Sequence, residues 1–260
     1  MLTLIFYLLS IFEYQEPGGS NSAILLSSTG NSQYIATAVN PAILPQLDKN
    51  GFGIVYCRPF DISLIQYNRL TANYQNFGIS FSRLGQTGYQ EYNLSLCAGF
   101  NFNTDLSYGV IFKGLYLDLG EYGQSFIPAL NLGFSYKIDK FRFGSVLENI
   151  NNPLSYEPVS GQNSAGEDIP WTILAGAIYE PVSDFLIGVD LCKTAQDENI
   201  TFGTELKPLP ILAVRLGTKT NPFIISGGLG ITFKNLSFDY TLKFHSRLRQ
   251  TSILSLGYFW

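Results

Sequence analysis

Hydrophobic and polar residues alternate along the end of the chain. From position 236 one face carries Leu236, Phe238, Tyr240, Leu242 and Phe244, and the other carries Ser237, Asp239, Thr241, Lys243 and His245. A period of two residues is typical of a β-strand with one apolar and one polar face. After a polar break a second alternating run ends on Tyr258 and Trp260. The two runs predict a hairpin of the kind that builds transmembrane β-barrels.

The same alternation continues backwards to Asn50. It predicts about 14 strands, an even number, with the length that a tilted membrane strand needs. The expected strands lie near residues 51–59, 66–75, 76–84, 89–101, 104–116, 126–137, 140–149, 169–180, 183–192, 198–207, 211–219, 222–233, 235–245 and 249–260. The sequence therefore predicts an all-β protein, a transmembrane antiparallel β-barrel over residues 50–260.

The connections between these strands fall into two kinds. If both termini lie in the periplasm, the short turns at 75–76, 137–140, 207–211 and 234–235 face the cell. The longer loops, at 118–125 and 151–170, fall on the opposite side, as in outer-membrane barrels. A soluble β-sandwich also alternates and is the competing fold, but its solvent faces carry more Lys and Glu.

Composition supports a membrane barrel over a helical membrane protein. Charged residues make up 14% of the chain, against roughly 25% in soluble domains, and aromatic residues reach 15%. Mean hydropathy is only +0.12, and no apolar run of about 18 residues occurs. Three dispersed cysteines indicate neither a disulfide framework nor a metal cluster. The net charge of −4 gives no indication of a nucleic-acid partner.

The region before the barrel divides into two parts. Residues 1–16 contain an apolar stretch of signal-peptide length, without a basic start or a clean cleavage site, so a mis-called start or a short anchor is the alternative. Residues 17–49 are too rich in Ser and Gly for a strand and too apolar for a linker. We expect this irregular segment to lie in the lumen as a plug, the alternative being a periplasmic tail that contacts a partner.

Several motifs of the chain occur in an order that suggests a family. They are Asn40-Pro41-Ala42, Leu147-Glu148-Asn149-Ile150, and, within 203–260, Glu205, Arg215 with Gly217, Gly228 with Gly230, Asp239-Tyr240, His245, Leu248 and Ser255-Leu256-Gly257. From about residue 40 onwards the chain resembles the PorV/PorQ family of FadL-like outer-membrane barrels. The segment before residue 40 departs from the family's usual opening, and the loops are short.

The resemblance implies a 14-stranded barrel in the bacterial outer membrane, with Asn40, Pro41 and Ala42 in an N-terminal hatch. It implies a non-enzymatic surface or secretion component, in a role like that of type IX secretion proteins. The alternative that it implies is a FadL-like gated passage that transports hydrophobic or other small solutes. The expected partners are outer-membrane lipid, the barrel-assembly machinery, and a secreted cargo protein or a hydrophobic solute.

Candidate site residues follow from the inward-facing positions. Glu205, Lys207, Arg215, Asp239 and Lys243 are the lumen-facing polar candidates, expected either to pair across the lumen or to form a solute-selective constriction. Tyr258 and Trp260 are the candidate assembly signal. Any catalytic triad would need His245, the one histidine of the sequence, and Asp239 lies roughly 20 Å away along the strand, so we expect no catalytic residue. Neither a phosphate-binding loop nor metal-ligand spacing is present, and no cofactor is expected.

Overall fold

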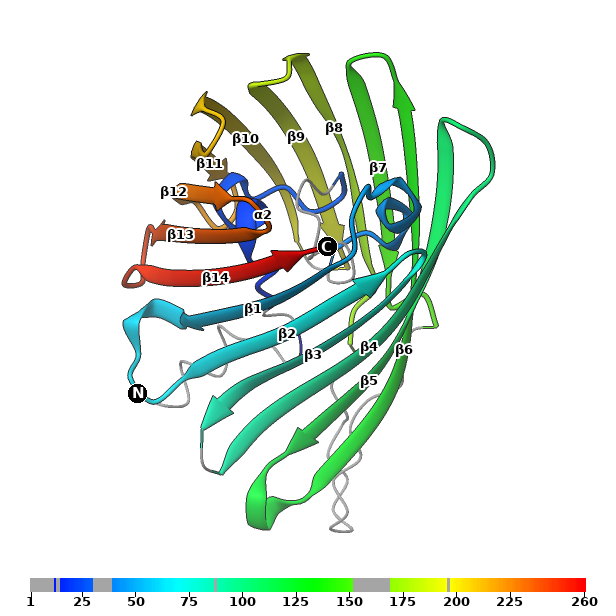
Figure 1. The fold of residues 1–260 in the computed structure, drawn as a ribbon. Coiled ribbons are helices and arrows are strands. Elements are labelled where there is room, and N and C mark those ends of the chain that lie inside the picture. Colours follow the sequence, from blue (N-terminus) through cyan, green and yellow to red (C-terminus); the bar gives the residue numbers. More distant parts are fainter. Residues whose placement is uncertain (1–11, 13–14, 30–38, 87, 152–168, 196) are drawn as a thin grey trace.

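The protein forms a closed antiparallel barrel of 14 strands (Figure 1). The computed structural model describes residue 12 and residues 15–29, 39–86, 88–151, 169–195 and 197–260. The strands are β1 (Gly51–Arg58), β2 (Gln66–Tyr74), β3 (Phe77–Gln86), β4 (Tyr89–Asn101), β5 (Leu106–Asp118), β6 (Gln124–Ile138), β7 (Phe141–Glu148), β8 (Thr172–Val182), β9 (Phe185–Thr194), β10 (Glu198–Leu209), β11 (Leu212–Lys219), β12 (Ile224–Phe233), β13 (Leu236–His245) and β14 (Thr251–Phe259). The predicted fold class and strand number are confirmed. Each expected strand is present, with ends displaced by at most three residues.

The described helices are short. They are α2 (Gly19–Ile24) and the 3-10 helices η2 (Pro41–Gln46), η3 (Pro59–Asp61) and η4 (Gly120–Tyr122). Among the described residues no helix is both long enough and apolar enough to cross a membrane.

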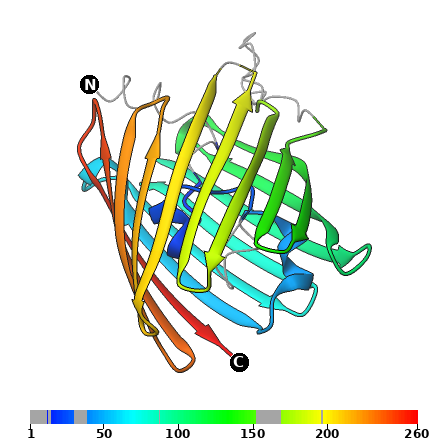
Figure 2. The same cartoon turned by 90° about the horizontal axis from the view of Figure 1, so that it is seen from above.

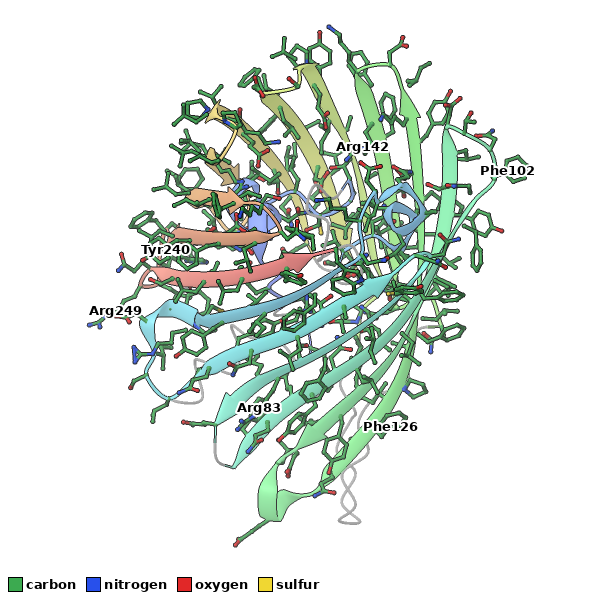
Figure 3. The ribbon with its side chains drawn as sticks, in the orientation of Figure 1. Arg83, Phe102, Phe126, Arg142, Tyr240 and Arg249 are labelled. Atoms are coloured by element: carbon green, nitrogen blue, oxygen red, sulfur yellow. The ribbon has the colours of Figure 1, made fainter. Side chains whose placement is uncertain are left out.

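The two faces of the wall follow the period of two. Along β13 and β14 the even-numbered residues from Leu236 to Tyr258 point outward, and the odd-numbered residues point into the barrel. The outer face carries large, exposed apolar side chains, including Tyr240 and Phe126, which project from the wall in Figure 3. The inner face carries small and polar residues. This is the opposite of a soluble protein, and it suits a wall surrounded by lipid.

The first and last strands close the barrel. β1 and β14 pair over eight positions, from Gly51 with Phe259 to Arg58 with Ser252. Beyond the strands, the backbone N–H groups of Asn50 and Trp260 donate to each other's carbonyl oxygens, at 3.2 and 3.1 Å. Neither strand therefore presents a free edge, which removes the unpaired backbone groups that a membrane cannot satisfy.

The two ends of the barrel differ in their connections. One end, here called the turn side, holds the two-residue turns after β2, β6, β8, β10 and β12 and also holds Trp260. The other end, the loop side, holds the connections after β1, β3, β5, β7, β9, β11 and β13, of which the one after β3 is also two residues long. The longest of these, between β7 and β8, lies mostly outside the described residues. The expected grouping of short turns at one end is therefore observed.

Part of the N-terminal region lies inside the barrel. Residues 15–29 and 39–47, here called the lumen segment, pass between the walls, with α2 beside β10–β14 and η2 beside β4–β6 (Figure 2). Most of their side chains are buried. The structure thus places the described part of the segment against the inner face, and its role as a plug remains a prediction.

Candidate functional site in the lumen

The lumen segment rests on glycines of the inner face. Gly99, Gly109 and Gly133 lie side by side across β4, β5 and β6. A Cβ added at any of them would overlap Pro41, and one at Gly133 would also overlap Asn40. The row therefore forms a flat seat that only residues without a side chain can provide.

Asn40 joins this seat to the rest of the segment. Its side-chain Nδ2 donates to the carbonyl oxygens of Ser28, at 2.6 Å, and of Phe134 in β6, at 3.0 Å. Its Oδ1 accepts from the N–H of Ala42 at 3.0 Å and caps η2. The three plug candidates, Asn40, Pro41 and Ala42, are all buried in the lumen. One amide thus fixes the bend of the segment and its position on the wall.

Helix α2 rests on a second set of glycines on the far wall. A Cβ at Gly203 would overlap Ile24, and a Cβ at Gly217 or Gly228 would overlap Ala23. The hydroxyl of Ser226 in β12 donates to the carbonyl oxygen of Ala23 at 2.5 Å. That bond satisfies one of the backbone acceptors left free at the end of so short a helix.

Asp190 of β9 holds the chain that follows α2. Its Oδ2 accepts from the N–H groups of Ser27 and Ser28, at 2.6 and 2.7 Å, and its Oδ1 accepts from the Ser28 hydroxyl at 2.6 Å. Three donors around one buried carboxylate compensate its loss of hydration. Sequence reasoning did not single out this residue, although an isolated inward acid among small residues is a usable signal of a partner across the lumen.

Three of the polar candidates form a buried ionic cluster near the turn side. Arg215 donates from Nε to Glu205 Oε2 and from Nη1 to Asp239 Oδ1, both at 2.5 Å. Gly230 lies beneath the guanidinium, where a Cβ would collide with it. Lys207, whose side chain is 43% exposed, approaches Glu205 at 3.5 Å. The cluster bridges β10, β11 and β13 and thus ties neighbouring strands of the wall.

Lys243, the fifth candidate, contacts the lumen segment instead of the wall. Its Nζ donates to both carboxylate oxygens of Glu16, at 2.9 and 2.8 Å. Ser22 also hydrogen-bonds Glu16. Sequence reasoning assigned Glu16 to the leader over residues 1–16, so it missed this pair. Most of that leader lies outside the described residues, but Phe12, Gln15 and Glu16 contact the barrel.

Tyr258 and Trp260, the candidate assembly signal, lie at the closing edge. Tyr258 is opposite Phe52 in β1 and Leu236 in β13, and its ring stacks on Trp260 with centroids 6.0 Å apart. Both rings are on the outer face. This is where aromatic side chains meet the membrane interface.

A cavity of about 330 Å³ lies between the lumen segment and the loop side. Phe12, Leu115 and Ile169 contribute apolar surface, while Arg69 and Lys113 contribute charge. Lys113 lies 3.7 Å from Glu148. The site is therefore an amphipathic chamber inside the wall. His245 lies apart from it at the end of β13, where its Nδ1 accepts from the N–H of Arg247 at 3.2 Å.

Comparisons with known proteins agree on the fold. No known family model matches the sequence, and no curated protein matches it. Among solved structures, the CymD monoaromatic hydrocarbon channel matches with a TM-score of 0.67 and 13% identity, over 95% of this chain and 98% of that chain. The toluene transporter TodX of P. putida gives 0.67 and 12%, over 95% and 99%. A FadL homologue of Pseudomonas aeruginosa gives 0.62 and 12%, over 95% and 97%.

These likenesses concern the fold. The chain has a closed 14-stranded antiparallel barrel that resembles FadL-type outer-membrane barrels. The FadL-like part of the expected resemblance thus agrees with the structural neighbours. None of the neighbours reported above is a PorV or PorQ protein, and that finer assignment remains a prediction.

Proposed function

We propose that this chain is a bacterial outer-membrane protein that passes small, mainly hydrophobic solutes through its lumen. We further propose that the lumen segment closes the path until it moves. The observation that carries the proposal is the chamber on the loop side of the lumen segment, enclosed by the wall and partly lined by apolar side chains. Such a chamber can accept a small molecule and release it only when its floor shifts. The channel and transporter named among the structural neighbours support the same class of function.

The contacts of the lumen segment suit a part that moves. Asn40, Asp190 and Lys243 hold it through hydrogen bonds and one ion pair. Water can replace such bonds at modest free-energy cost, because the net contribution of each is only about 1 kcal/mol, or somewhat more for charged groups. The wall keeps its own interstrand bonds throughout. Opening therefore requires no break in the barrel.

The plug is tested by removing it. A chain beginning at Asn50 is refolded into lipid beside the full chain, and folding is checked by heat-modifiable migration on a gel. We expect the shortened barrel to conduct ions far better in planar bilayers, because water fills the space that the segment occupied. Equal conductance of the two folded proteins would contradict the plug and favour a periplasmic tail.

Passage is tested with toluene, the compound named for the TodX neighbour. Leu44 of the segment and Cys97 of β4 belong to one apolar cluster. Oxidising a Leu44→Cys variant, with the cross-link verified by mass spectrometry, should therefore fix the segment to the wall. Labelled toluene should enter cells expressing the reduced variant, and oxidation should stop it. The same oxidant on the wild type, which lacks the added thiol, is the control. Entry that is unaffected by the cross-link would refute gating by this segment.

The secretion role implied by the PorV/PorQ resemblance is the other candidate, and it remains a prediction. It requires a surface on the loop side that binds a cargo protein. Co-purification from detergent-solubilised outer membranes, followed by mass spectrometry of proteins and lipids, separates the two roles. A secreted protein in stoichiometric amount would favour secretion, and its absence together with toluene entry would favour passage.

A further inference from the structure

Arg69 is a buried cation to which the described residues offer no carboxylate partner. It comes from the middle of β2, points into the barrel, is 2% exposed, and lines the loop-side chamber. None of the ion pairs among the described residues includes it. Its Nε and Nη1 have no hydrogen-bond partner within the described part of the chain. The guanidinium lies 5.6 Å from the centroid of the Tyr67 ring, but the hydration that Nε and Nη1 lose on burial is not replaced by a hydrogen bond within the described residues.

The nearby acids already have other partners. Glu16 binds Lys243, and Glu148 lies near Lys113. Along the chamber wall, the cations Arg69, Lys113 and Lys219 outnumber the carboxylates of Glu148 and Asp197 by three to two. Among the described residues of the lining this leaves an excess of one positive charge, which favours an anion.

Gln15 provides the hydrogen bond that Arg69 makes within the described part of the chain. Its Oε1 accepts from Arg69 Nη2 at 2.6 Å, and its Nε2 donates to the carbonyl oxygen of Phe12 at 3.3 Å. Nε and Nη1 are covered and have no hydrogen-bond partner among the residues that the structure describes. A neutral amide oxygen thus lies where an anionic oxygen would bind a guanidinium more strongly. Because Gln15 belongs to the lumen segment, it leaves this place when the segment shifts.

We propose that the chamber binds a small organic anion with an apolar body, such as an aromatic carboxylate. The carboxylate displaces the Gln15 amide and accepts from Arg69 Nη2 in its place, while the ring lies against Phe12, Leu115 and Ile169. This proposal rests on the proposed function in that it names the solute class. It separates this chain from the neighbours named for uncharged hydrocarbons, because a neutral ring supplies no negative charge to the guanidinium.

The test uses benzoate and its neutral counterpart benzamide, titrated by calorimetry into the refolded full chain in uncharged detergent. The wild type should bind benzoate at least about tenfold more tightly than benzamide, which corresponds to about 1.4 kcal/mol. Gln15→Glu supplies an internal carboxylate, so it should weaken benzoate binding about tenfold or more and leave benzamide unchanged. Gln15→Ala should strengthen benzoate binding, because the competing amide is gone.

The matched control is Gln46→Glu, which places the same charge on the same segment. Gln46 hydrogen-bonds Ser107 and Ser135 on the turn side, away from Arg69, so benzoate affinity should not change. Arg69→Gln should abolish the preference for benzoate over benzamide. The Gln15 variants test the same point without removing a buried wall residue, should Arg69→Gln fail to fold.

Equal wild-type affinities for the two probes, or no benzoate binding at millimolar concentration, would overturn the anion site. So would equal losses for Gln15→Glu and Gln46→Glu. Benzoate preference without passage of any solute would refute the proposed function and keep the site. Toluene entry without benzoate preference would refute the anion site and keep the proposed function.

Discussion

Removing the cation of the ionic cluster should strongly destabilise the barrel. Arg215 is 8% exposed and bonds Glu205 and Asp239, which are 3% and 5% exposed. In an Arg215→Met variant the methionine fills part of the volume, but two carboxylates remain buried without the guanidinium. Removing one partner of a buried ion pair typically lowers the free energy of unfolding by about 3 to 5 kcal/mol. We expect a loss in that range, because both carboxylates accept a hydrogen bond from this one guanidinium.

The neutralised triple variant decides whether charge or packing causes the loss. Glu205→Gln and Asp239→Asn, combined with Arg215→Met, remove all three charges and nearly preserve side-chain volume. Since a buried ion pair is often replaceable at little cost, this variant should recover most of the stability. A Gln or Asn left with unmatched hydrogen bonds retains a penalty of about 1 to 3 kcal/mol, so recovery should be incomplete.

Urea unfolding of barrels refolded into lipid vesicles measures these differences. The fluorescence of Trp260, at the closing strand pair, reports the transition, and heat-modifiable migration gives an independent signal. A loss in the free energy of unfolding below about 1 kcal/mol for Arg215→Met would contradict the predicted contribution of the buried cluster, because that value is typical of solvent-exposed pairs. A triple variant no more stable than the single variant would show that packing, and not charge, determines the effect.

Three other predictions concern the wall and its seat. Leu229→Lys, on the outer face at the middle of β12, should lower the free energy of unfolding by about 2 to 4 kcal/mol, whereas Phe233→Lys at the strand end should lower it by about 0 to 1 kcal/mol. Equal losses in urea unfolding would argue against a membrane-spanning wall. Deleting residues 258–260 should prevent closure of β14 on β1 and abolish heat-modifiable migration, and a truncated chain that still migrates as a folded barrel would refute this. Gly133→Ala should push Asn40 off its seat and raise ion conductance in planar bilayers while the barrel still folds, and unchanged conductance would mean that the seat does not hold the plug.

The wall could be predicted from the sequence because its determinants are local. A period of two, apolar outer positions and polar breaks are all readable within a single strand or hairpin. The strand number and the residues on each face of β13 and β14 therefore agree with the structure. The ends of the strands were less accurate, since a strand in a barrel ends where its neighbour stops pairing. The start of β8, three residues late, follows its pairing with Glu148 of β7.

The contacts inside the lumen were harder to predict because they join distant parts of the chain. Lys243 meets Glu16 across 227 positions, and Asp190 meets Ser28 across 162. Pattern reasoning found Lys243 as an inward charge but could not find its partner. It passed over Asp190 and Arg69, although each is a charged residue at an inward position. The strand register would have indicated that Arg69 needs a partner from elsewhere, because it lies opposite Val55 and Ser82, neither of which can neutralise its charge.

The inward glycines are where the wall contacts the lumen segment. A barrel needs side chains to fill its interior, and this wall provides none at Gly99, Gly133 or Gly203. Backbone and side-chain atoms of Asn40, Pro41 and Ile24 take up that volume. The interstrand hydrogen bonds of the wall do not depend on those contacts. Under the proposed function, the segment leaves its place without breaking the wall, as a gate requires, and the glycines beneath it then leave open space.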